Sequence, residues 1–174
     1  MHLQTAIPEC HLRPWQIEDK QALLLHANNR SIWRNLIDMF PNPYTEADAD
    51  WWLSFTATPG PDIHFAIELH GQAVGGIGVI VGEGIRRYTG QFGFWLGEAN
   101  WGHGVATAAA NTMAHYALGQ SQFARLEAPV IAWNVASMRV LEKVGFLREG
   151  VLRKSVFKDG QLTDSVMYAL VRDV

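Results

Sequence analysis

Two glycines separated by one residue connect an alternating apolar segment to an alanine-rich segment. Gly102 and Gly104 follow residues 91–97, whose alternation predicts a strand, and precede residues 105–119, whose pattern predicts a helix. Glycine lets the backbone approach a ligand closely, and the first N–H groups of a helix have no acceptor within that helix. Because a strand, a glycine loop and a helix in this order can hold a phosphate group, the segment predicts a nucleotide-type cofactor.

Two other phosphate-binding motifs fit this segment less well. A P-loop needs glycine, four further residues and then Gly-Lys-Ser/Thr, and the sequence contains no such string. The dinucleotide fingerprint is incomplete because Thr107 stands where its third glycine or alanine belongs.

The bulk properties favour a small globular protein. The 174 residues fit one domain, residues 1–174, and 48% of them are hydrophobic. A net charge of −3 argues against nucleic-acid binding and against an anionic membrane surface. Cys10 is the single cysteine, which excludes an internal disulfide and a cysteine-based zinc site. With no signal-peptide pattern and no apolar run of about 18 residues, we expect a cytoplasmic protein that needs no metal.

The periodicity of apolar residues predicts a mixed α/β chain, with antiparallel strands early and late and a β-α-β-α order between them. The predicted strands are residues 10–15, 63–69, 74–81, 91–97, 126–131, 147–157 and 162–171. The predicted helices are residues 18–29, 30–37, 46–55, 105–119 and 134–144. Thr45 and Asn134 are suited to N-caps, Gly145 to a left-handed helix end, and Asp159-Gly160 to a hairpin turn.

Two motifs together indicate a family. The first is Trp101-Gly102-His103-Gly104-Val105-Ala106-Thr107, and the second is Asn134-Val135-Ala136-Ser137 followed by Val140-Leu141-Glu142-Lys143-Val144-Gly145-Phe146. With a strand between them, they resemble the GCN5-related N-acetyltransferase (GNAT) superfamily, in particular its RimJ/RimL-like branch. The resemblance covers almost the whole chain. It implies an α/β fold with a central, mostly antiparallel mixed sheet of about six or seven strands, splayed in the middle, with helices on both faces.

The resemblance also implies acetyl-CoA as co-substrate and assigns residues to it. The glycine loop would hold the pyrophosphate, the end of the preceding strand would contact the pantetheine arm, and the second motif would lie beside that arm and the thioester. The implied cofactor-binding residues are Trp95, Leu96, Gly97, Trp101, Gly102, His103, Gly104, Val105, Ala106, Thr107, Asn134 and Ser137.

The catalytic residues are less well determined. The resemblance implies that Ser137 protonates the leaving thiolate, although Asn134 and Ser137 also suit simple helix capping. Val156 stands where ribosomal-protein-acetylating relatives carry a glutamate, so Glu98 is our candidate for the base. A solvated strand-end glutamate is the alternative interpretation of Glu98. Asp164 and His64 are lesser candidates, and a bound amine that arrives neutral would need no base.

The region between the first two predicted strands would wall the acceptor pocket in this superfamily. The candidate acceptor-binding residues are Trp33, Asp38, Tyr44 and Trp52. Aromatic rings and carboxylates suit a cationic amine, and an aromatic packing cluster with solvated acids is the alternative interpretation. We therefore expect a primary amine, on a peptide N-terminus or a small molecule, as the partner. A homodimer is expected by analogy alone.

Three functions remain open at this point. The first is acetyl transfer from acetyl-CoA to an amine in a ternary complex. The second is an acyl-CoA sensor of the same fold that does not catalyse transfer, which the absent carboxylate at Val156 would explain. The third is a dinucleotide-binding protein.

Overall fold

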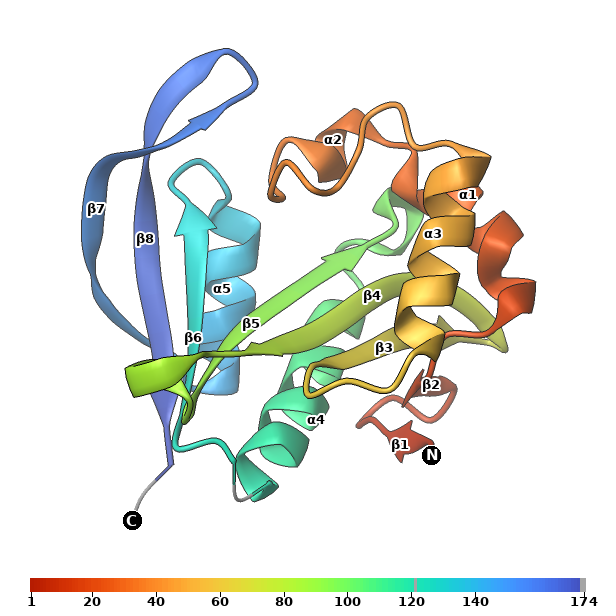
Figure 1. Ribbon diagram of the computed structural model, residues 1–174, viewed down its shortest axis with the longest axis horizontal. Helices are drawn as coiled ribbons and strands as arrows, with labels where there is room; N and C mark the ends of the chain where they lie inside the picture. The colour runs from red at the N-terminus through yellow and green to blue at the C-terminus, as the bar shows by residue number, and fades with distance from the viewer. Residues whose placement is uncertain (121, 173–174) are drawn as a thin grey trace.

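An open mixed sheet organises the part of the chain that the structure describes (Figure 1). The computed structural model describes residues 1–120 and 122–172. The sheet has eight strands in the order β1-β2-β3-β4-β5-β6-β8-β7. Their bounds are β1 Leu3–Gln4, β2 Cys10–Arg13, β3 Ile63–Leu69, β4 Gln72–Val81, β5 Thr89–Leu96, β6 Arg125–Ile131, β7 Leu147–Lys158 and β8 Gln161–Val171.

Helices cover both faces of this sheet, as the resemblance implied. The α-helices are α1 Lys20–Ala27, α2 Arg30–Trp33, α3 Glu46–Ala57, α4 Val105–Gly119 and α5 Val135–Val144, and the short 3-10 helices are η1 Ile17–Asp19, η2 Gly84–Arg86 and η3 Glu98–Asn100. The α4 helix packs on one face with α5 beside it, while α1 and α3 lie on the other. Among the described residues, none of the helices combines the length and the hydropathy that a membrane span requires.

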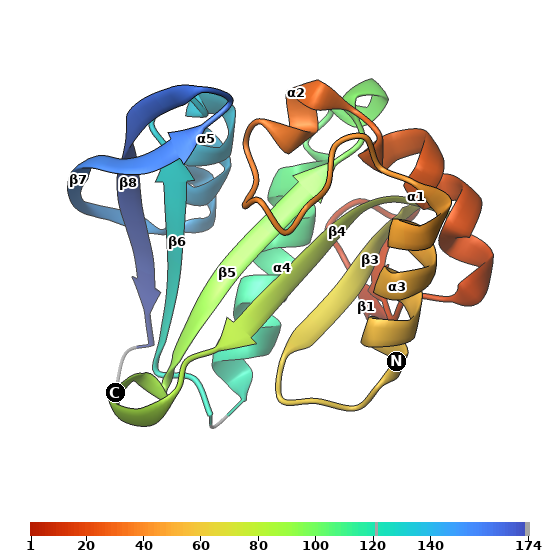
Figure 2. The same cartoon turned by 45° about the horizontal axis from the view of Figure 1, so that its top comes forward.

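The sheet opens between β5 and β6. These two strands are parallel, and their register pairs only Thr89 to Gln91 with Arg125 to Glu127. Beyond that point the strands diverge, and Figure 2 shows the wedge between them widening toward α2 and α5. The predicted splay is therefore present, and it leaves the upper part of β5 without a strand partner on its β6 side.

Alternating side chains of β5 supply two hydrophobic clusters. Phe92 and Leu96 are buried in the main core, which α4 also fills. Trp95 points the other way and packs against a smaller cluster formed by α1, α3 and the loop before α3. The end of β5 is thus held from both sides, and this is the strand end expected to contact the pantetheine arm.

Several local predictions are confirmed. β3 and α4 have the predicted bounds. Thr45 caps α3, because its hydroxyl accepts the N–H of Asp48 and its own N–H donates to the Asp48 carboxylate. Gly145 adopts φ +101° at the end of α5. At the hairpin turn, Asp159 and Gly160 have φ values of +52° and +75°.

Other boundaries were predicted incorrectly. The first predicted strand ends at Arg13, because Pro14 has no N–H to continue the ladder. The predicted helix 18–29 divides into η1 and α1, and the predicted helix 30–37 ends at Trp33. Beyond Trp33 the backbone continues in turns, in which Asn35 N–H donates to the carbonyl of Ile32 and Leu36 N–H to that of Trp33, while the side chain of Asn35 accepts from the indole of Trp133. The two-residue β1 was not predicted, and it makes the sheet larger than expected.

Candidate functional site

The glycine loop has the backbone conformation that its sequence predicts. Gly102 and Gly104 have φ values of +80° and +79°, a region that other residues rarely adopt. An added Cβ at either position would meet no atom within 4 Å. Glycine is therefore required by backbone conformation and not by crowding, and the space above the loop is open to a ligand.

The N–H groups of this loop are unpaired. Trp101 N–H donates to the carbonyl of Glu98, and regular helical bonding begins where Ala108 N–H donates to the carbonyl of Gly104. Between them, no N–H from Gly102 to Thr107 has an acceptor within residues 1–120 and 122–172. These donors lie at the positive end of the α4 dipole, so the loop offers an anion both charge and hydrogen bonds.

Trp101 is fixed beside the loop. Its indole Nε1 donates to the carbonyl of Leu96 at 2.7 Å, while 43% of the residue stays exposed. This bond ties the loop back to the end of β5. It also uses one lone pair of a carbonyl that was expected to face the pantetheine arm.

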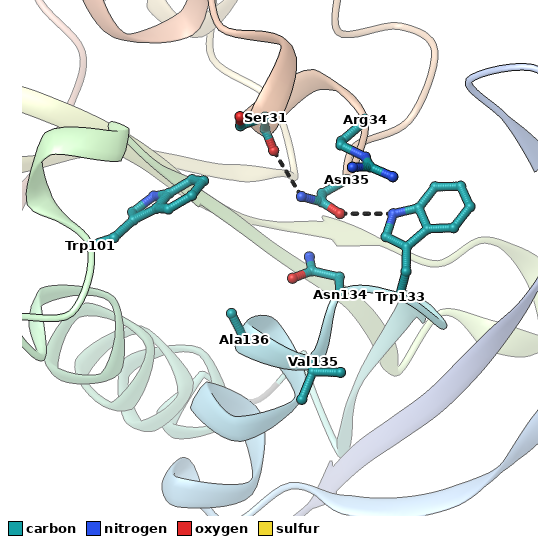
Figure 3. A pocket seen from close by; sticks show the side chains of 8 residues that line it. All are labelled: Ser31, Arg34, Asn35, Trp101, Trp133, Asn134, Val135 and Ala136. Carbon is teal, nitrogen blue, oxygen red and sulfur yellow. Dashed lines mark hydrogen bonds between the residues drawn. The ribbon is translucent and has the colours of Figure 1, made fainter.

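A pocket of about 320 Å³ lies beside the splay (Figure 3). Its walls come from the α2 region, from Trp101 and from the connection between β6 and α5. Figure 3 shows Trp101 on one side and Trp133 with Arg34 on the other. The lining residues are Ser31, Arg34, Asn35, Trp101, Trp133, Asn134, Val135 and Ala136. Two predicted cofactor residues, Trp101 and Asn134, thus face one cavity.

Asn134 and Ser137 form the N-terminal cap of α5. The side-chain oxygen of Asn134 accepts the backbone N–H of Ser137 at 3.2 Å. The amide nitrogen of Asn134 and the hydroxyl of Ser137 have no hydrogen-bond partner among the described residues. Capping therefore uses only part of each residue, and the remaining polar groups are available to a ligand.

Glu98 lies beside the acceptor-side helices. It begins η3, just after β5 ends, and its exposed carboxylate accepts from the amide of Asn29 at 2.7 Å. The lesser candidate Asp164 accepts the N–H of Lys154 at 2.7 Å. Val156 pairs with Thr163 near the tip of the β7–β8 hairpin, so β7 carries no carboxylate at that position.

The four predicted acceptor residues do not form one surface. Lys158 is 3% exposed, and its ammonium group pairs with Asp38 at 2.8 Å and lies 3.9 Å from the ring centroid of Trp33. Tyr44 is buried in the smaller cluster, and Trp52 packs against it. Burial, with the nearby Asp48 charge as a lesser cause, raises the pKa of Tyr44 to about 12. Their assignment to acceptor binding remains a prediction.

Comparison with known proteins identifies the family. Residues 10–147 match the model of the Acetyltransferase (GNAT) domain. The chain belongs to the GNAT acetyltransferase family. The probable N-acetyltransferase YjcK of Bacillus subtilis is 39% identical over 79 residues, which are 45% of this chain and 44% of YjcK. The chain spans about half the length of the curated relatives it matches.

Solved structures agree with this GNAT assignment. RimJ of Mycobacterium smegmatis, in complex with CoA-disulfide, superposes with a TM-score of 0.81 at 25% identity, over 98% of this chain and 86% of RimJ. RimL, a ribosomal L7/L12 alpha-N-protein acetyltransferase in complex with coenzyme A, superposes with a TM-score of 0.86 over 98% of each chain. At 18% identity the second match shows the fold alone. The resemblance to the RimJ/RimL-like branch is confirmed.

Sequence reasoning missed two residues beside the GNAT site. His26, at the end of α1, packs against Gly97 so closely that an added Cβ there would lie 2.5 Å from its Nδ1. Burial lowers the pKa of His26, so the ring is neutral at physiological pH. Arg34 lines the pocket and stacks on Trp133. Neither stands in a motif, and only the packing of distant segments reveals them.

His64 is a packing residue in this GNAT domain. Its ring contacts Trp52 and Phe55, with centroids 5.3 and 5.4 Å away, and its buried Nε2 has no hydrogen-bond partner in the described chain. Burial lowers the pKa of His64, partly opposed by Asp62. As the pH falls below about 6.5, the unfolded chain takes up this proton before the folded chain does, so stability decreases.

We therefore expect His64→Phe to weaken the decrease in stability between about pH 7 and pH 5. Urea unfolding at several pH values measures how the free energy of unfolding changes with pH. His26 also has a lowered pKa and would account for part of the pH dependence that remains in the variant. An unchanged slope in the variant would show that His64 does not contribute.

Proposed function

We propose that this protein transfers an acetyl group from acetyl-CoA to a primary amine, with both bound at once. The observation that carries the proposal is the run of unpaired N–H groups from Gly102 to Thr107 at the start of α4. Their number and the helix dipole suit the pyrophosphate of the co-substrate. Membership of the GNAT family and the coenzyme A in the similar RimJ and RimL structures support the same ligand.

The wedge between β5 and β6 suits the pantetheine arm. The β6-facing edge of β5 beyond Gln91 has no strand partner, so its backbone groups can bind a polar chain. Asn134 lines the pocket beside this wedge. Trp95, Leu96 and Gly97 would supply backbone contacts, with the Leu96 carbonyl already shared with Trp101.

Ser137 is the proposed proton donor to the departing thiolate. Its hydroxyl has no partner in the described residues, and its backbone N–H alone serves the Asn134 cap. Acetyl-CoA supplies the thioester and the leaving thiolate. A hydroxyl held near that sulfur would lower the barrier by stabilising the negative charge that develops there.

Glu98 remains our candidate for accepting the proton of the amine. Its carboxylate is exposed beside η3, where a chain of water molecules can connect it to the end of β5. The hydrogen bond from Asn29 fixes its position. The neutral ring of His26, which packs against Gly97, is a second acceptor at the same strand end.

Thiol release from acetyl-CoA with a panel of peptide N-termini and small amines tests the function. We expect release above background with at least one amine. Coenzyme A should also raise the melting temperature. Stabilisation by coenzyme A without turnover on any amine would instead support an acyl-CoA sensor, and stabilisation by NAD alone would point to a dinucleotide-binding protein.

Ser137→Ala separates catalysis from binding. Because the cap uses only its backbone N–H, the variant should fold and bind coenzyme A like the wild type. We expect kcat to fall about tenfold to hundredfold. Ser54→Ala, at an exposed position on α3, is the matched control and should leave kcat unchanged. An unaltered kcat in the Ser137 variant would remove this residue from the mechanism.

A further inference from the structure

Arg34 is a cation without an anion at the candidate site. It lines the pocket of Figure 3 and also a second pocket of about 240 Å³, which Arg30, Ser31 and Asp159 complete. Within residues 1–120 and 122–172, no carboxylate pairs with Arg34 and none of its nitrogens donates a hydrogen bond. Its neighbour Arg30, by contrast, pairs with Asp159 at 2.7 Å.

The guanidinium group of Arg34 is held in place although it has no polar partner. Its Cζ lies 5.2 Å from the ring centroid of Trp133, and the indole of Trp133 is itself fixed by a hydrogen bond to Asn35. The Nε of Arg34 is buried and has no acceptor. A buried donor without an acceptor is unfavourable, and the planar fork of arginine matches a carboxylate or a phosphate.

Asp38, which was expected to receive a cationic amine, and two acidic residues of α3 have partners of their own. Asp38 pairs with Lys158, and Asp50 pairs with Lys20 at 2.9 Å. Asp48 accepts from the N–H and hydroxyl of Thr45 in the cap of α3. Among the charged residues that line the two pockets, Arg30 and Asp159 pair with each other, and Arg34 alone has no ionic partner within the described chain.

We propose that Arg34 binds an anionic group, a carboxylate or a phosphate, on the acceptor amine. This inference rests on the proposed function and specifies its substrate class. The acceptor's anion would lie on Arg34, on the side of the second pocket, and its amine would point toward the Asn134 side, where the pantetheine arm is proposed to lie. A polycation such as spermidine is a poor acceptor on this basis.

Matched acceptors test the charge requirement. Glycine, β-alanine and 4-aminobutanoate are compared with their carboxamides, and O-phosphoethanolamine with ethanolamine, because each pair differs in the anion and keeps a primary amine. Removing the anion also lowers the pKa of the amine, most of all in glycinamide, so kcat/KM is expressed per neutral amine. For the best pair we expect the acid to exceed its neutral partner at least about tenfold in kcat/KM. In Arg34→Gln the ratio should fall to about one, with an unchanged affinity for coenzyme A.

Two further variants keep the test specific. Arg34→Lys keeps the charge without the planar fork and should retain part of the preference. Arg87→Gln removes a cation from the exposed connection before β5, at the opposite end of that strand, and should behave as wild type. An equal preference in wild type and Arg34→Gln would overturn the inference. So would a loss of coenzyme A affinity that accounts for the whole loss of turnover, since Arg34 would then bind the co-substrate.

Failure of the proposed function would give a different result. If wild type releases no thiol with any amine, calorimetry of the same acid and carboxamide pairs on coenzyme A-loaded protein decides the matter. Selective binding of the acid that Arg34→Gln abolishes would support the anion site in a protein that does not transfer acetyl groups. Transfer to amines without regard to charge would support the function and overturn the anion site.

Discussion

Gly104→Val is expected to weaken the binding of coenzyme A strongly while the protein stays folded. At φ +79° a β-branched residue is strained, so the chain would turn the loop toward an ordinary conformation and misdirect the N–H groups that follow. Losing two charge-assisted hydrogen bonds would weaken binding by about a hundredfold or more. Calorimetric titration with coenzyme A measures the loss, and circular dichroism checks the fold.

Gly119→Ala is the matched control for this loop variant. Gly119 is the last residue of the same helix, its φ is not positive, and an added Cβ would meet nothing within 4 Å. We expect unaltered affinity for coenzyme A there. If Gly104→Val bound coenzyme A as tightly as Gly119→Ala, the backbone of this loop would not be the pyrophosphate site.

Arg13→Met is expected to cost about 3–5 kcal/mol of folding stability, because it leaves buried carboxylates unpaired. Arg13 is 3% exposed and donates to both oxygens of Asp19, at 2.7 and 2.8 Å, and also to Glu68. The hydrogen bond with Asp19 raises the pKa of Arg13 further above its usual range. Urea unfolding measures the loss.

The consequences of this substitution extend to the acceptor side of the site. The Asp19 carboxylate also accepts the N–H of Gln16, and Asp19 is the N-cap residue of α1. Since α1 leads directly into α2, a loosened Asp19 should also weaken the positioning of Arg34. Activity near the melting range would then fall before coenzyme A binding does.

A second substitution and a surface control check the explanation. Asp19→Asn, added to Arg13→Met, removes one buried carboxylate that has lost its ionic partner, and it should recover part of the lost stability. Arg87→Met makes the same substitution at an exposed arginine and should change the free energy of unfolding by no more than about 0.5 kcal/mol. A cost below about 1 kcal/mol for Arg13→Met would mean that this network contributes little to folding.

Local features of the site were predictable because near neighbours in the chain decide them. The glycine positions, the caps at Thr45 and Asn134, and the Asp159-Gly160 turn follow from the backbone preferences of a few adjacent residues. Element boundaries were predicted less well. Beyond Trp33 the predicted helix 30–37 gives way to turns, and the side chain of Asn35 there accepts from Trp133, a residue 98 positions away that periodicity cannot include.

The acceptor side could not be predicted in the same way. The bond between Lys158 and Asp38 joins residues 120 positions apart, and that between Arg30 and Asp159 spans 129 positions. A sequence shows which charges exist but not which ones meet. The sequence therefore could not show that Lys158 pairs with Asp38, the carboxylate predicted to bind a cation. Nothing near Arg34 in the sequence indicates that it lacks an ionic partner.

The sequence by itself predicted most of the elements and the loop that can receive a diphosphate, because these depend on glycine conformation, capping and periodicity, and its two motifs carried the resemblance to the family. Only the tertiary structure decided which charges meet around the candidate site. Folding pairs Asp38, Asp50 and Arg30 with partners from distant segments and leaves Arg34 without an ionic partner among the described residues. These pairings are properties of the folded chain, since the distance between two charges decides how strongly they interact and only the fold sets that distance.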